Sequence, residues 1–303
     1  MDFSAFPTLA ELKDRARTWA QENGLGAYTG SAGARGRAGD EETLGWQRDA
    51  FKSRIDMVGL NLNLPVRPIL LEGTDGMEGA KEVLREAYRN EPLFRWLLGD
   101  VRKDNKGKFK ENLLLEWYID WRISSCWRYS HCLAIPQRSR PGQGASFGDD
   151  GEQDIELRGC AIVTYPGSKQ DLDRLMVMWN SGASPPADCG TAAKARFAAY
   201  EHMNSARDRL AGQGAHWSVH LLGVAPDDMG QGVGRMVMRI ICALADQDAL
   251  PVHLQVCGSR NRAFFEQCGF RAMQTVDVCS EDSPVVKIYH MTRVPFPKSI
   301  ELV

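Results

Sequence analysis

A glycine-rich turn that directly follows an apolar strand is the part of this sequence best suited to bind a ligand. The predicted strand covers residues 216–224, and the turn reads Met229-Gly230-Gln231-Gly232-Val233-Gly234-Arg235. Glycines let the backbone approach a ligand without Cβ clashes, and the unpaired amides of the next helix add the positive end of its dipole. The turn therefore predicts a site for a phosphate or pyrophosphate group.

A second motif follows after one helix and a short strand, residues 252–256. Residues 254–270 read Leu-Gln-Val-Cys-Gly-Ser-Arg-Asn-Arg-Ala-Phe-Phe-Glu-Gln-Cys-Gly-Phe. In their order, spacing and strand-turn-helix context, the two segments resemble the cofactor motifs of the GCN5-related N-acetyltransferase (GNAT) superfamily. Those motifs read Gln/Arg-x-x-Gly-x-Gly/Ala and L-E-T-S-N-x-x-N-x-x-F-Y-E-x-x-G-F. The resemblance extends over about residues 66–293.

The resemblance implies an acyl-coenzyme A co-substrate, acetyl-coenzyme A or another acyl-CoA. In this superfamily the turn amides hold the pyrophosphate, strands four and five splay apart, and strand four pairs with the pantetheine arm like an added strand. The thioester then lies where the strands part. The residues implied in cofactor binding are Leu222, Val224, Met229, Gly230, Gln231, Gly232, Val233, Gly234, Arg235, Asn261, Phe264 and Phe265.

Two positions depart from the family pattern. Met229 stands where the first motif has Gln or Arg, and Arg235 is a possible replacement charge. Phe265 stands where many members carry a tyrosine that protonates the departing sulfur, and phenylalanine has no proton to give. Because a thiol of pKa about 8.5 leaves tolerably as its anion, this loss slows acyl transfer without abolishing it.

We therefore expect an acyltransferase acting on a small-molecule amine or hydroxyl. The alternatives are the same fold used for cyclisation, isomerisation or decarboxylation, and a non-catalytic coenzyme A-binding protein.

Histidines supply the candidate general bases. An amine must be neutral to attack a thioester, and imidazole suits the role of proton acceptor. Strand alternation predicts that His220 and Ser218 share a side with Leu222 and Val224. Members of the family often carry a glutamate as general base at the position of His220, so His220 is our first candidate for the base. The alternative is that His220 only forms hydrogen bonds within the sheet. The predicted catalytic residues are His220, His290 and Ser218. His131 is a further candidate that we do not include in this set.

Composition narrows the class of partner. The 303 residues carry 37 basic and 39 acidic side chains, for a net charge of −2, which argues against nucleic-acid and membrane surfaces. The N-terminus lacks the features of a signal peptide, no apolar run of membrane-spanning length exists, and the eight cysteines form no CxxC pair. We expect a cytoplasmic monomer or homodimer with a small-molecule substrate and no metal.

The order of predicted elements gives the fold class. We expect an α/β protein with a mixed, central twisted sheet of about seven strands flanked by helices. Residues 1–64 form an N-terminal extension, with helices at 8–23 and 41–56 around a glycine-rich segment, and residues 65–303 form the catalytic domain. A helical insertion between residues 165 and 214 is interpreted as a lid over the acceptor, with surface decoration as the alternative. The aromatic helix 106–125 is predicted either to pack in the core or to line the acceptor pocket.

Overall fold

The computed structural model describes residues 37–98, 116–120, 123, 131–137, 156–164, 196, 215–280 and 283–296. The chain divides into two compact units, Met1–Phe51 and Lys52–Val303. The predicted helix 8–23 lies outside the described residues, as do nearly all of the insertion at 165–214 and most of the helix 106–125. The domain boundary at residue 64, with its N-terminal extension, stays a prediction.

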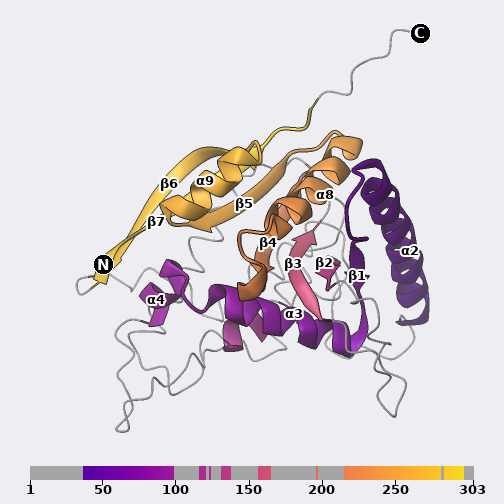
Figure 1. Ribbon diagram of the computed structural model, residues 1–303, viewed down its shortest axis with the longest axis horizontal. Helices are drawn as coiled ribbons and strands as arrows, with labels where there is room; N and C mark the ends of the chain where they lie inside the picture. Colours follow the sequence, from indigo (N-terminus) through magenta and orange to yellow (C-terminus); the bar gives the residue numbers. More distant parts are fainter. Residues whose placement is uncertain are drawn as a thin grey trace, which may run out of the picture. The chain divides into compact units, whose positions relative to one another are not determined.

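A seven-stranded mixed sheet forms the centre of the second unit (Figure 1). Its strands are β1 (Ile69–Leu71), β2 (His131–Pro136), β3 (Leu157–Thr164), β4 (Trp217–Val224), β5 (Val252–Cys257), β6 (Arg271–Ser280) and β7 (Ser283–Arg293). They lie in the order β1-β2-β3-β4-β5-β7-β6, and only β4 and β5 are parallel neighbours. The predicted fold class, a mixed central sheet of about seven strands flanked by helices, is confirmed.

Helices occupy the connections between these strands. The described ones are α2 (Arg37–Asn61), α3 (Gly73–Tyr88), α4 (Pro92–Leu98), α8 (Val233–Asp248) and α9 (Ser259–Gln267), with a short 3-10 turn, η3 (Pro226–Asp228). The predicted helix 41–56 is found within the longer α2. Of the helices whose residues are described, none has the length and apolar character needed to cross a membrane.

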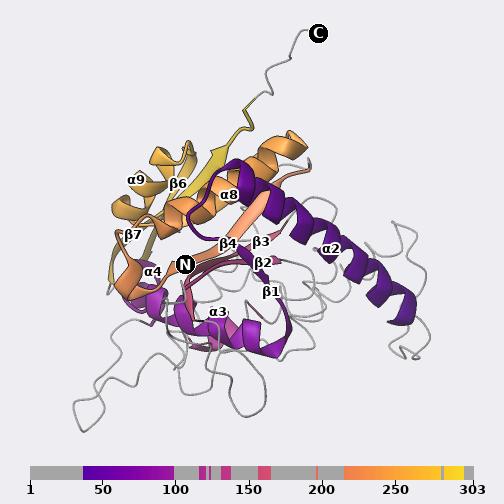
Figure 2. The ribbon, with the colours of Figure 1, turned by 45° about the vertical axis from the view of Figure 1, so that its right-hand side comes forward.

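Helices α3 and α8 pack on opposite faces of the sheet (Figures 1 and 2). A Cβ added at Gly223 of β4 would lie 2.9 Å from Leu84 Cδ2 of α3, and one added at Gly159 of β3 would lie 2.9 Å from Val233 Cγ1 of α8. Glycine at these two positions lets each helix approach the strands closely. We call the two sides of the sheet the α3 face and the α8 face.

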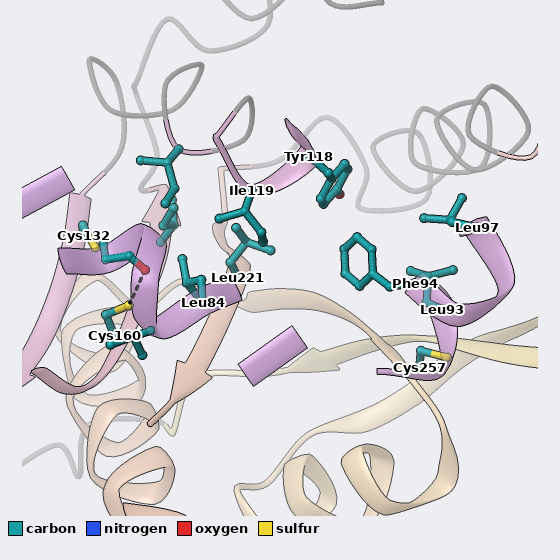
Figure 3. Close-up of a cluster of buried hydrophobic side chains, with 14 of the residues drawn as sticks. Leu84, Leu93, Phe94, Leu97, Tyr118, Ile119, Cys132, Cys160, Leu221 and Cys257 are labelled. Atoms are coloured by element: carbon teal, nitrogen blue, oxygen red, sulfur yellow. Dashed lines mark hydrogen bonds between the residues drawn. The ribbon is translucent and has the colours of Figure 1, made fainter. Parts of the chain in front are cut away.

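An apolar core fixes α3 and α4 against the α3 face. Figure 3 shows Leu84, Leu221 and Ile119 gathered in one cluster, and all three side chains are buried. Phe94 of α4 lies edge-on to Tyr118 at a centroid distance of 5.2 Å and to Tyr88 at 5.5 Å. Full burial of such side chains stabilises a fold by roughly 1.5–3 kcal/mol each, so the junction of α3 and α4 is held firmly.

Helix α8 is tied down at its C-terminal end. Its apolar stripe, Val233, Val237, Ile240, Ile241 and Leu244, is buried, as the i, i+3, i+4 spacing predicts. Carboxylates at a helix C-terminus oppose the helix dipole, but here arginines neutralise them. Arg293 donates two hydrogen bonds of 2.8 Å to Asp246, and Arg54 donates one of 2.7 Å to Asp248. The glycine-rich turn at the other end therefore rests on a fixed helix.

Candidate active site

The glycine-rich turn presents bare backbone at the start of α8. Gly230 and Gly232 adopt φ values of 81° and 83°, in the left-handed region that favours glycine. Apart from each glycine and its two chain neighbours, no heavy atom of the described residues lies within 4 Å of the place where a Cβ would stand at either position. Gly232 caps α8 and its carbonyl accepts the Met236 N–H at 2.9 Å. The first amides of α8 are thus left at an open, glycine-lined surface.

Side chains around the turn brace it from one side. Arg158 of β3 donates to Asp228 Oδ1 at 2.7 Å and to Gln231 Oε1 at 2.8 Å, while Gln231 Nε2 donates to the Asp227 carbonyl at 2.8 Å. The Gln231 side chain therefore holds the turn in shape with both of its polar atoms.

The two departures in the first motif have different surroundings. Met229 is 49% exposed and offers no charge. Arg235 donates from Nη2 to Gln267 Oε1 at 2.8 Å, which links α8 to α9. Arg235 is thus a cation beside the turn, anchored at the end of the second motif.

Strands β4 and β5 part where the family resemblance implies. Their parallel pairing covers Trp217↔Val252, Ser218↔His253 and Val219↔Leu254, and it goes no further. The Ala225 N–H donates to the Arg158 carbonyl at 2.8 Å, so alternate residues of β4 bond to β3 and those between them point their amides toward β5. The amides of Leu222 and Val224 therefore face an edge that carries no paired strand.

A β-bulge interrupts β4 at His220. Ile162 pairs with Leu221 and the next residue, Val163, pairs with Val219, so His220 is the extra residue of the bulge. Its Nε2 lies 2.9 Å from Thr164 Oγ1, on the α3 face. The prediction of unbroken alternation along this strand is wrong. The extra residue shifts the alternation by one position, so every later side chain lies on the face opposite to the one that its residue number predicts.

The bulge separates the two sets of residues that alternation had grouped together. Trp217, before the bulge, bonds to Asp248 of α8 at 3.0 Å, so it lies on the α8 face and its neighbour Ser218 on the α3 face. After the bulge, Val224 packs on the α8 face, near Gly234. His220 therefore lies on the opposite face from the Leu222 and Val224 side chains, and only the backbone of those two residues adjoins the gap.

Polar side chains gather on the α3 face next to this gap. Ser218 pairs with His253 of β5, and paired residues lie on the same face. His253 and Gln255 are two residues apart and so share that face, and Gln255 pairs with His290 of β7. The three predicted catalytic residues, His220, His290 and Ser218, thus share one face of the sheet. His131 pairs with Val163 on β2 and β3, on the α8 face, so the expectation that it faces the same site is wrong.

Glu91, between α3 and α4, is a titratable residue of this face that the sequence analysis did not select. Its carboxylate accepts the Leu93 N–H at 2.7 Å and the Phe94 N–H at 3.2 Å, and it hydrogen-bonds to the Cys257 thiol of β5. Burial raises the pKa of Glu91 from 4.5 to about 7. The sequence signal, an acid before Pro92 at a helix start, indicates a cap but not the contact with Cys257 of β5.

Helix α9 contributes packing at the second motif. Phe265 is buried, with its ring edge-on to Phe264 at 4.9 Å and to Phe270 at 5.8 Å. The Phe264 ring lies 3.4 Å from where a Cβ at Gly234 would stand, so that glycine permits the close packing of α8 on α9. Asn261 Nδ2 donates to the Cys257 carbonyl at 3.0 Å and ties the helix to β5. The ligand contacts expected of these residues stay predictions.

Among the residues that the structure describes, no cluster of three or more His, Cys, Asp or Glu side chains could hold a metal ion.

No family model matches the chain. Among solved structures it is similar to arylalkylamine N-acetyltransferase 2 from Aedes aegypti, at 14% identity over 76% of this chain and 99% of that one, with a TM-score of 0.47. It is also similar to a histone acetyltransferase HPA2-related acetyltransferase from Corynebacterium glutamicum, at 16% identity over 77% and 99% of the two chains, with a TM-score of 0.45. The seven-stranded mixed sheet and the parting of β4 from β5 agree with the GNAT resemblance of the two sequence motifs.

Proposed function

We propose that the protein transfers an acyl group from acetyl-coenzyme A, or another acyl-CoA, to an amine or hydroxyl of a small molecule. The observation that carries this proposal is the junction of a bare glycine turn at the start of α8 with the unpaired edge of β4. A ligand that fits both parts combines a phosphate group with an extended arm of amides, and coenzyme A has that composition.

The two halves of such a ligand would bind by different interactions. Phosphate oxygens would accept hydrogen bonds from the first amides of α8, where Gly230 and Gly232 leave room, and the helix dipole adds a favourable field. The amide arm would extend the sheet from β4 through the Leu222 carbonyl and the Val224 backbone, in the manner of an added strand, because the Leu222 N–H already donates to Tyr88 Oη at 3.3 Å. This arrangement would deliver the thioester to the point where β4 and β5 part.

A base on the α3 face would then take the proton of the attacking amine. His220, oriented by Thr164, is the first candidate, and Glu91 is the second because its pKa of about 7 suits a base at neutral pH. His220→Ala should lower kcat roughly 100-fold and remove the acidic limb of its pH profile if His220 is the base. If Glu91→Gln does so instead, the role passes to Glu91.

Phe265 favours one alternative function. Its buried ring offers no proton to a departing sulfur, so the fold could serve a reaction that has no acyl donor, such as a cyclisation, an isomerisation or a decarboxylation. This alternative predicts that the protein does not use acyl-CoA.

Titration calorimetry with acetyl-coenzyme A, followed by thiol release with a panel of amines, tests the proposal. We expect binding that Gly232→Ala weakens, and transfer to at least one small amine. No heat and no thermal shift at millimolar ligand would refute the transferase and favour the alternative. Binding without transfer to any acceptor would instead indicate a non-catalytic coenzyme A-binding protein. The small-molecule acceptor, cytoplasmic location and monomeric or dimeric state remain predictions from the sequence.

A further inference from the structure

We propose that the Tyr88 hydroxyl donates the proton that the departing coenzyme A sulfur takes up, the role that Phe265 cannot fill. This inference rests on the proposed acyl transfer. Tyr88 is the last residue of α3, whereas Phe265 belongs to α9. The donor would therefore approach the reacting thioester from the α3 face of the sheet.

The geometry places this hydroxyl at the unpaired edge of β4. The Leu222 N–H, which points into the gap between β4 and β5, donates to Tyr88 Oη at 3.3 Å. Among the described side chains, Tyr88 thus reaches the backbone amide that adjoins the proposed thioester position. Its ring is fixed edge-on to Phe94 at 5.5 Å with an interplanar angle of 88°.

The direction of this hydrogen bond matters for the chemistry. A backbone N–H can only donate, so the Tyr88 oxygen accepts, and the phenolic proton is not used in that bond. Phenols of ordinary pKa, about 10, are protonated at neutral pH. A protonated phenol beside a backbone donor can supply a proton to a leaving group that gathers negative charge.

The proposed step balances in protons and electrons. The amine nitrogen forms a bond to the thioester carbonyl carbon, the C–S bond breaks, and its electron pair goes to sulfur, which takes the Tyr88 proton. The amine proton goes to the base on the α3 face, His220 or Glu91. Transfer of that proton to the Tyr88 oxygen restores both groups, and the net products are an amide and a thiol.

Tyr88→Phe tests the proposal, because it removes one oxygen and keeps the ring that packs on Phe94. We expect kcat to fall about 100-fold or more, the alkaline limb of the pH profile to disappear, and acetyl-coenzyme A affinity to change less than about threefold. Phe265→Tyr in the Tyr88→Phe background should restore part of the rate, since it returns a donor to the family position. Tyr289→Phe, which removes a phenol beside Arg262 of α9, is the control and should leave kcat unchanged.

A second measurement covers the case in which Tyr88→Phe does not fold. Incorporation of 3-fluorotyrosine at position 88 lowers the phenol pKa, so the alkaline limb should move to lower pH. An active wild-type enzyme whose Tyr88→Phe variant keeps kcat and pH profile, or whose limb stays in place with fluorotyrosine, overturns the assignment of Tyr88 alone. A wild-type protein that releases no thiol from acetyl-coenzyme A overturns the proposed function and this inference together.

Discussion

Replacing Glu91 with glutamine should change how the stability of the protein depends on pH. In the folded chain burial raises the pKa of Glu91 from 4.5 to about 7. Below about pH 4.5 the carboxyl is protonated in both the folded and the unfolded chain, so the stabilisation from this proton is fully present. Between pH 4.5 and 7 the unfolded chain loses the proton while the folded chain keeps it, so the unfolding free energy falls as pH rises.

The size of the effect follows from the two pKa values. One pKa unit corresponds to about 1.4 kcal/mol, so the total loss is about 3 kcal/mol, most of it between pH 5 and 8. Glutamine keeps an oxygen for the Leu93 and Phe94 amides but does not titrate. The wild-type protein should therefore lose about 2–3 kcal/mol relative to Glu91→Gln over this range.

Urea unfolding at several pH values, followed by tryptophan fluorescence, measures this difference. Glu82→Gln, at an exposed position of α3, is the matched control for the loss of one carboxylate and should follow the wild-type curve. If the wild-type protein and Glu91→Gln show parallel curves from pH 5 to 8, the folded protein does not hold a proton on Glu91 and the reasoning is refuted.

Three further substitutions test the site and the sheet. Gly232→Ala should lower the unfolding free energy by about 1–2 kcal/mol, because alanine is strained at a φ of 83°, and should weaken acetyl-coenzyme A binding about tenfold by calorimetry. The control is Gly269→Ala, at φ 88°, which should show the strain without the loss of binding. Equal binding by the two variants would contradict the proposed phosphate site. Gly223→Ala should lower the unfolding free energy by about 1–3 kcal/mol in urea titration, since its Cβ would stand 2.9 Å from Leu84 Cδ2; an unchanged midpoint would show that α3 can move away. His220→Ala should reduce kcat roughly 100-fold with little change in coenzyme affinity, His216→Ala should be milder, and an unchanged pH profile would remove His220 as the base.

The sequence predicted the elements whose patterns are local. The glycine-rich turn is readable from the sequence alone, and the i, i+3, i+4 spacing of apolar residues after it agrees with the buried stripe of α8. The parallel contact of β4 with β5 is the arrangement expected for the strand-helix-strand order β4-α8-β5. These features need no knowledge of distant residues.

The bulge and the buried carboxyl could not be predicted in this way. Burial along β4 alternates without a break from Trp217 to Val224, so the sequence of the strand carries no mark of the extra residue at His220. The bulge exists only in the register with β3. In the same way, Glu91 has the local context of a helix cap, and its raised pKa comes from burial in a region that includes Cys257 of β5, far along the chain.

The bulge at His220 exists because β4 has one more residue than β3 over their paired stretch, so the candidate site depends on the length of β4. Deleting a single residue there would let β3 and β4 pair without interruption, and no apolar residue would need to change type. The residues on either side would keep their faces, so Leu222 would still adjoin the gap, and only the His220 side chain beside Thr164 would be lost. Deletion of this one residue, which leaves the rest of the strand in register, is therefore a change by which a lineage could lose the candidate base while it keeps the free edge of β4.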